Sequence, residues 1–331
     1  MCKNNDTIEV ERGIVMCTAV SFVSKDHYFG RNLDLDHSYG ECVVITPRQF
    51  VFEMRHLEAL KTHYALIGMA VVADKTPLYY EATNEKGLSM AGLNFPGNAV
   101  YKAYDASKDN VAPFEFIPWI LGQCEDVQQA KRLLVKMNLV NTNFTDQLPL
   151  TPLHWIISDS KTSLTVESVK DGLKIYDNPW GVLTNNPTFD YHLINMHQYM
   201  GLKEANEVNT LNPEIELNNI SLGFGALGLP GDYSSISRFV RAAYVKSKSF
   251  FGNSEKENVS QFFHILNAVA MPKGCVQCPN GEFEYTRYSC CCNTKTGIYT
   301  YTTYHNSTKN SVDLHSVNLN ASELICYELI E

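Results

Sequence analysis

Six polar or reactive residues lie inside otherwise apolar segments of the chain, and one of them, Cys17, is a potential nucleophile. A cysteine thiol with a pKa near 8.5 is only a few per cent ionised at neutral pH, so nucleophilic catalysis needs a base beside it. The sequence offers Cys17 no obvious histidine partner. The six are Cys17 in MCTAVSF, Arg31 and Asp34 in FGRNLDLD, Asn94 in AGLNFPG, Asn185 in GVLTNNP and Arg238 in SSISRFVRA.

Each of these motifs, taken alone, also fits an ordinary structural role. Asparagine beside a proline or glycine is common turn chemistry, and an arginine on a helix is common surface. A cysteine in an apolar strand is often a small buried hydrophobic residue. Only the joint occurrence of the six, in this order and spacing, indicates a functional site.

Signatures of several other enzyme classes are absent from the sequence. It has no phosphate-binding glycine loop with a lysine, no dinucleotide fingerprint and no H-E-x-x-H motif. His192 and His197 are five residues apart, which does not place them on one helix face, so no metal pair is predicted. Cys275-x-x-Cys278 followed by residues 290–292 hints at zinc. Adjacent strand residues point to opposite faces, however, so we interpret these cysteines as buried free thiols rather than metal ligands.

Composition and charge argue against several other function classes. Hydrophobic residues make up 44% of the chain and charged residues 19%, which suits a sizeable core. The net charge is −9 without a basic cluster, so we expect no nucleic-acid partner. No apolar run approaches the roughly 20 residues of a membrane span, and the N-terminus lacks the pattern of a secretory signal. We therefore expect a cytoplasmic protein, without a membrane partner, in which most of the ten cysteines stay reduced and form no disulfide framework.

The elements that must position these residues are blocks of strands separated by pairs of helices. Strands are predicted over 15–24, 27–36, 41–50, 64–73, 77–84, 87–94, 153–159, 164–169, 173–177, 180–186, 282–290, 297–306 and 323–329, and helices over 113–124, 125–138, 234–251 and 256–270. Blocks of this kind are typical of an α+β fold with antiparallel sheets. Two sheets stacked face to face and covered outside by helices would satisfy the pattern. No linker or repeat divides the chain, so we predict a single domain over 17–331.

The segments that carry the six residues resemble the choloylglycine hydrolase family, which holds bile salt hydrolases and penicillin V acylases. The similarity extends from Cys17 to near the C-terminus. It includes MCTAVSF, YFGRNLD, NEKGLSMAGLNFPG, NPWGVLTNNPTF, SSISRFVRA and the late YTRYSCCCN…GIYTYTTYHN hairpin. The resemblance implies the αββα four-layer sandwich of the N-terminal-nucleophile hydrolases, in agreement with the predicted blocks. It also implies a homo-oligomer, a tetramer or a dimer, and no cofactor.

The resemblance further implies a catalytic role for each residue. In this family the α-amino group of an N-terminal cysteine is the base for its own thiol, so Cys17 would form a thioester acyl-enzyme. Asp34 would orient that amino group, and Arg31 would favour the thiolate. The Asn185 side-chain amide and a backbone N–H of the Asn94 segment would bind the oxyanion.

Substrate preference follows from the same resemblance. Bile salt hydrolases commonly carry asparagine at the position of Asn94, where penicillin V acylases often carry tyrosine. We therefore predict hydrolysis of glycine- or taurine-conjugated bile salts. Leu33 and apolar residues of the 60–70 and 140–150 loops are candidates to line a steroid pocket, and Arg238 would hold the polar network together. Two alternatives stay open, a penicillin V or other N-acyl amide hydrolase (acyl-homoserine lactones included) and a catalytically silent binder of acyl ligands.

Residues 1–16 depart from the family pattern, in which the cysteine directly follows the initiating methionine. Three explanations stay open. In the first, Met16 is the true start and residues 1–16 reflect a mis-assigned start codon or leader. In the second, the segment is a propeptide that Cys17 removes by attack on its own preceding peptide bond. In the third, Cys2 is the exposed cysteine. We favour the first, because purine-rich codons that resemble a ribosome-binding site can encode Glu11-Arg12-Gly13, shortly before Met16. Nothing around Cys2 matches the family, which counts against the third.

Overall fold

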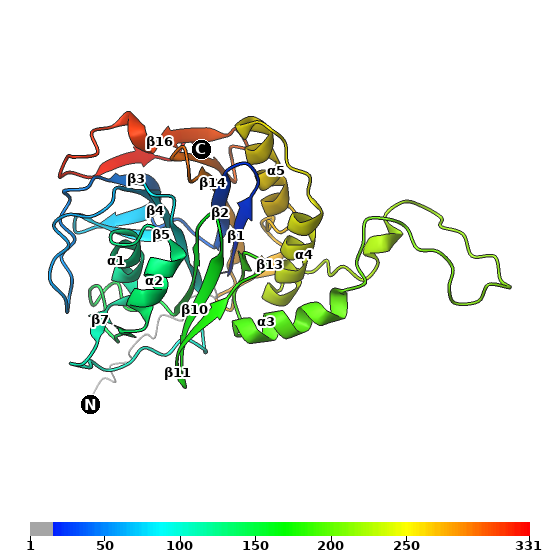
Figure 1. The fold of residues 1–331 in the computed structure, drawn as a ribbon, viewed down its shortest axis with the longest axis horizontal. Coiled ribbons are helices and arrows are strands. Elements are labelled where there is room, and N and C mark those ends of the chain that lie inside the picture. Colours follow the sequence, from blue (N-terminus) through cyan, green and yellow to red (C-terminus); the bar gives the residue numbers. More distant parts are fainter. Residues whose placement is uncertain (1–15) are drawn as a thin grey trace, which may run out of the picture.

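The computed structural model describes residues 16–331, so the predictions for residues 1–15 lie outside the described part of the chain. Two sheets stacked face to face form its centre (Figure 1). The first has the order β12-β1-β2-β14-β15-β16, with β13 paired to β14. Its strands are β1 (Met16–Val23), β2 (His27–Leu35), β12 (Val182–Leu183), β13 (Val276–Gln277), β14 (Phe283–Asn293), β15 (Ile298–Thr303) and β16 (Asn310–Asp313).

The second sheet has the order β11-β10-β9-β6-β5-β4-β3-β17 and is antiparallel throughout. Its strands are β3 (Cys42–Thr46), β4 (Leu66–Ala73), β5 (Thr76–Asn84), β6 (Ser89–Asn94), β9 (Leu153–Ser158), β10 (Ser163–Val169), β11 (Gly172–Asp177) and β17 (Ile325–Glu328). A short parallel pair, β7 (Asp109–Val111) with β8 (Met137–Leu139), lies outside both sheets.

Helices cover the outer face of each sheet (Figure 1). Those on the second sheet are α1 (Phe116–Leu121) and α2 (Val127–Leu134), and those on the first are α4 (Ser235–Lys248) and α5 (Glu255–Asn267). Three apolar cores follow from this layering, one between the sheets and one under each helix layer. The predicted α+β fold with four αββα layers is confirmed. Within residues 16–331, no helix combines the length and apolar character that crossing a membrane requires.

The largest differences from the predicted elements lie between residues 180 and 200. The strand predicted over 180–186 shrinks to the two residues of β12, because the Thr184 hydroxyl and the Asn185 main-chain N–H donate to Ser235 rather than extend a sheet. Helix α3 (Phe189–Met196) was not predicted. Its buried positions are Phe189, His192 and Asn195, so polar residues interrupt the apolar periodicity that marks a helix.

Candidate active site

Strands β1 and β2 place the candidate nucleophile in the inter-sheet core. Cys17 pairs with Leu33, and Ala19 pairs with Arg31. Because strand side chains alternate between faces, Cys17, Leu33 and Arg31 point between the sheets, whereas Asp34 points toward the helix layer. Cys17 is 1% exposed, and Arg31 and Asp34 are fully buried.

Arg31 is fixed by main-chain oxygens of the second sheet. Its Nη1 donates to Gly92 O at 2.6 Å and to Tyr80 O at 3.1 Å. Its Nη2 finds no hydrogen-bond partner among residues 16–331. Burial raises the pKa of the Cys17 thiol, and the Arg31 guanidinium acts in the opposite direction. The geometry therefore places a fixed positive charge where it favours a thiolate.

Sequence reasoning missed the carboxylate behind Arg31. Glu81 Oε2 lies 3.8 Å from Arg31 Nε. The Tyr288 and Tyr299 hydroxyls donate to the two Glu81 oxygens at 2.7 and 2.6 Å. Glu81 is 2% exposed, and its charge balances the arginine in the core. An acidic residue inside the apolar run PLYYEATN was the only sequence signal for it.

Two carboxylates lie beside the backbone that precedes Cys17. Asp34 Oδ1 accepts from Thr286 Oγ1 at 2.6 Å, while Oδ2 lacks a hydrogen-bond partner in the described chain. Burial raises the pKa of the Asp34 carboxyl to about 6, although Arg238 pulls it down. Glu284, which the sequence did not single out, accepts from the Met16 main-chain N–H. Burial, reinforced by the charge of Asp34, raises the pKa of Glu284 to about 8.

Asn185 joins three of the other predicted residues. Its Oδ1 accepts from the Cys17 main-chain N–H at 2.9 Å and from Arg238 Nη2 at 2.7 Å. Its Nδ2 donates to Asn94 O at 2.7 Å. Because Oδ1 must accept two hydrogen bonds and Nδ2 must donate one, the orientation of the Asn185 side-chain amide is fixed.

The start of helix α4 places the Arg238 side chain against strand β1. Ser234 caps the helix by accepting from the Ser237 main-chain N–H. Arg238, in the first turn, then reaches Thr18 Oγ1 at 2.6 Å and Tyr233 O at 3.0 Å and also binds Cys17 O. The six residues predicted as a site therefore come together around Cys17, on both faces of the first sheet.

The predicted pocket-lining segments differ in their placement. Leu33 is 1% exposed and packs in the core beside Cys17. The predicted loop over 60–70 ends earlier than expected, since residues from Leu66 onward form β4 and pair with β3 and β5. Residues 141–150 contain no helix or strand.

The late cysteines behave as the strand pattern predicts. Cys290 and Cys292 point into the inter-sheet core and Cys291 points toward the helix layer, so adjacent thiols do face opposite ways. Across residues 16–331, no group of three or more histidine, cysteine or acidic side chains is arranged to hold a metal ion.

Two stacked antiparallel sheets between helix layers, with a cysteine on a central strand of one sheet, define an N-terminal-nucleophile hydrolase fold. The family model of the linear amide C–N hydrolases, choloylglycine hydrolase family, matches residues 17–327. The chain belongs to this family.

Curated relatives and solved structures match nearly the whole chain. The bile salt hydrolase/transferase of Lactiplantibacillus plantarum is 52% identical over 314 residues, which cover 95% of this chain and 97% of the relative. That of Clostridium perfringens is 38% identical over 323 residues, with 95% and 97% covered. A crystal structure of a variant conjugated bile acid hydrolase from Clostridium perfringens superposes with a TM-score of 0.88, at 35% identity and 95% and 97% coverage. Penicillin V acylase from Agrobacterium tumefaciens, at 19% identity, TM-score 0.74 and coverage of 93% and 90%, shares the fold.

Proposed function

We propose that this protein hydrolyses the amide bond of glycine- or taurine-conjugated bile salts through a thioester on Cys17. The observation that carries the proposal is the bonding of one asparagine, Asn185, to the Cys17 N–H, to Arg238 and to Asn94 O. Support for the substrate comes from relatives named for bile salt hydrolysis, which match over nearly their full lengths.

The first half-reaction requires Cys17 to be the first residue of the chain. Its nitrogen is then an amine with a reference pKa of about 7.7–8.0, suited to accept the thiol proton near neutral pH. The thiolate attacks the substrate carbonyl carbon, and the carbonyl π electrons move onto oxygen. Asn185 and a backbone N–H of the Asn94 segment stabilise this oxyanion, one such donor being worth about 2.7–4 kcal/mol. The C–N bond then breaks, and the amine of glycine or taurine leaves with the proton from Cys17.

The second half-reaction returns the enzyme to its starting state. A water molecule gives a proton to the Cys17 amine and attacks the thioester carbon through the same oxyanion site. The C–S bond breaks, the bile acid leaves, and the thiol is restored. Arg31 stabilises the thiolate in both halves, and Asp34 orients the ammonium group. Glu284, which accepts from the main-chain N–H of Met16 one residue before Cys17, would add a second negative charge near that ammonium group once Met16 is removed.

We assign substrate choice to residues beside Cys17. Leu33, opposite Cys17 in the β1–β2 ladder, borders the acyl group, and Asn94 contributes the side chain typical of bile salt hydrolases. The test is a panel of glycine and taurine conjugates with penicillin V and an acyl-homoserine lactone as competitors, compared by kcat/KM. Preference for penicillin V or the lactone would contradict the substrate assignment while keeping the reaction class.

Intact-mass spectrometry of the purified protein tests the nucleophile. We expect a chain that begins at Cys17. On brief treatment with iodoacetamide, activity should be lost in step with carbamidomethylation of Cys17, which peptide mapping distinguishes from that of the exposed Cys275 and Cys326. Expression from the Met16 codon is the matched control. An active protein that retains residues before Cys17 would contradict the mechanism, and an inactive one would favour a silent acyl-ligand binder.

We also propose that residues 17–331 act as a single domain and that the protein forms a homo-oligomer. The pairing of β17 with β3 joins the end of the chain to its beginning, which supports one domain. Residues 200–230 project away from the body (Figure 1) and expose apolar side chains that a partner copy would cover. The most exposed are Met200, Val208, Leu211, Ile220, Leu222 and Leu227. Light scattering of wild type and of Leu211→Ser/Leu222→Ser is expected to show a tetramer or dimer that dissociates in the variant.

We place this activity in the cytoplasm. The nine cysteines within residues 16–331 are all free thiols, as a reducing compartment favours. Fractionation of the producing cells, with activity in the medium as the contrary result, tests this location.

A further inference from the structure

Asn185 lies on a loop that has little support from strand pairing. The preceding strand, β12, contributes only Val182 and Leu183 to a ladder with β1, and the chain then leaves the sheet. An oxyanion donor must stay within a few tenths of an ångström of its working position, and a displacement of 1 Å can lower the rate about 100-fold. The loop therefore needs other supports.

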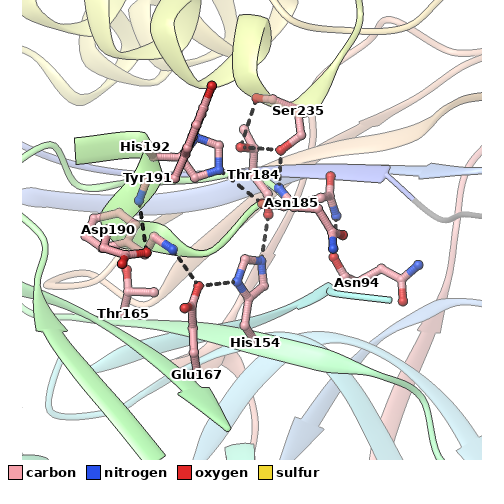
Figure 2. Close-up of polar contacts among 12 residues, drawn as sticks. Asn94, His154, Thr165, Glu167, Thr184, Asn185, Asp190, Tyr191, His192 and Ser235 are labelled. Atoms are coloured by element: carbon pink, nitrogen blue, oxygen red, sulfur yellow. Dashed lines mark hydrogen bonds and ion pairs between the residues drawn. The ribbon is translucent and has the colours of Figure 1, made fainter. Parts of the chain in front are cut away.

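The carbonyl oxygens of Thr184 and Asn185 are each held by a buried histidine (Figure 2). His154 Nε2 lies 2.9 Å from Thr184 O, and His192 Nε2 lies 3.1 Å from Asn185 O. A carbonyl oxygen only accepts, so both nitrogens carry a hydrogen. Ser235 completes the support, since its Oγ accepts from the Asn185 main-chain N–H at 2.8 Å.

Glu167 is the partner of the other ring nitrogen of His154. Glu167 Oε1 is 3.0 Å from His154 Nδ1 and also accepts from the Phe189 main-chain N–H at 3.0 Å. A proton shared between Nδ1 and Oε1, on either atom, satisfies that contact. In both cases Nε2 keeps its hydrogen for Thr184 O. Both side chains are fully buried, so water does not compete for these bonds.

His154 also connects the two segments that are to bind the oxyanion. Its ring stacks on Phe95 with centroids 4.2 Å apart and planes 6° apart. Phe95 directly follows Asn94, whose carbonyl accepts from Asn185. One imidazole thus holds the Asn94 segment through its face and the Asn185 segment through its edge. His192 makes a similar link to α4, because it stacks on Phe239, the neighbour of Arg238.

We propose that His154, with Glu167, and His192 are positioning residues for amide hydrolysis, which hold the Thr184 and Asn185 carbonyls so that the Asn185 amide meets the oxyanion. This inference rests on the proposed function. It assigns the histidines no contact with substrate and no proton transfer to it.

The test compares His154→Ala with His154→Gln, alone and with Asn185→Ala. We expect His154→Ala to lower kcat about 10–100-fold with KM changed less than about threefold. His154→Gln, which can still donate to Thr184 O, is expected to recover most of that loss. In the Asn185→Ala background, His154→Ala is expected to have no further effect, since it acts through Asn185.

A second readout separates positioning from general damage. Alkylation of Cys17 by iodoacetamide displaces iodide directly and forms no tetrahedral oxyanion, so its rate is expected to stay within about twofold of wild type in His154→Ala. The matched control is His63→Ala. His63 is also buried and binds two main-chain oxygens, of Phe50 and Tyr64, but it lies away from the Asn185 loop. We expect its kcat to equal that of wild type.

Several results would overturn the inference. These are an unchanged kcat in His154→Ala, an equal loss in His63→Ala, a multiplicative loss in the double variant, or an alkylation rate that falls together with kcat. If His154→Ala does not fold, Glu167→Leu carries the same test with a smaller expected loss of kcat that is again absent beside Asn185→Ala. Failure of the proposed function can be distinguished from failure of this inference. A wild type that cleaves another N-acyl amide contradicts only the substrate, and the comparison is repeated on that amide, whereas a wild type that cleaves no amide overturns both proposals.

Discussion

The two ends of the β1–β2 ladder both bury polar side chains between the sheets, but they differ in charge. At the end away from Cys17, Ser21 Oγ lies 2.9 Å from His27 Nε2 and 2.6 Å from Ser158 Oγ. His27 Nδ1 is 3.1 Å from Thr294 Oγ1. Burial lowers the pKa of His27 to about 4, so this cluster is neutral at physiological pH.

At the Cys17 end, by contrast, ionisable groups are buried without complete compensation. Arg31 Nη2 and Asp34 Oδ2 lack hydrogen-bond partners within residues 16–331. Leaving such atoms unpaired lowers the free energy of unfolding. By distance alone, Ser21 and His27 would fit a nucleophile and its base better than Cys17 fits any base. The incomplete hydrogen bonding of Arg31 and Asp34 supports the proposal that the chemistry lies at the Cys17 end, despite the short serine–histidine distance at the other end.

The largest effect is expected from the nucleophile itself. Cys17→Ala removes the only atom that can form the thioester, so kcat/KM for a conjugated bile salt should fall on the order of 10⁴-fold or more. Ser21→Ala is the matched change at the other end and should keep kcat/KM within about threefold. A comparable loss in Ser21→Ala would move the chemistry to the histidine end.

Asp34→Asn should separate activity from stability. It removes the charge that we propose to orient the Cys17 ammonium, so kcat should fall about 100-fold. The raised pKa of Asp34, about 6, means that the ionised carboxylate destabilises the fold above pH 6. The free energy of unfolding at pH 7 should therefore rise by about 3 kcal/mol in the variant, and this gain should vanish below about pH 3, where the carboxyl is protonated in both the folded and the unfolded state. Thermal unfolding at the two pH values checks the sign, and a destabilised variant at pH 7 would contradict it.

The titration of the Asp34 carboxyl should also be visible in the pH dependence of wild-type activity. Protonation of the Cys17 amine, with its reference pKa of about 7.7–8.0, should begin to lower kcat below that range. Below about pH 6, Asp34 also gains a proton and no longer holds the ammonium, so the fall in kcat should steepen there. His27→Gln should leave this acid limb unchanged. A shift of the limb in His27→Gln would show that the two ends are coupled.

The smallest effect on catalysis is expected from His27→Leu. The variant leaves the Ser21 and Thr294 hydroxyls without their imidazole partner, which should lower the free energy of unfolding by about 1–3 kcal/mol. The value of kcat/KM should stay within about twofold, since no charge near Cys17 changes. Denaturant unfolding and steady-state kinetics of the same preparation make the comparison.

Much of the fold could be predicted because its elements follow local patterns. Short runs of β-branched and aromatic residues bounded by turn residues predict the strands that carry MCTAVSF and FGRNLDLD, and the segment that begins at Ser234 predicts the helix α4. The interrupted periodicity of α3 hid that helix. The six site residues were recognised through their motifs, whereas Glu81, Glu284 and the His154–Glu167 pair belong to no motif.

The sequence by itself determined the blocks of strands and helices, the candidate nucleophile and the polar residues that accompany it. Those depend on side-chain periodicity and residue chemistry, which are local. Only the tertiary structure decided which carboxylate faces Arg31, which one faces the Met16 N–H, and which histidines hold the Asn185 loop. These contacts join strands and loops far apart in the chain, and burial there sets both the charge and the cost of each unpaired atom.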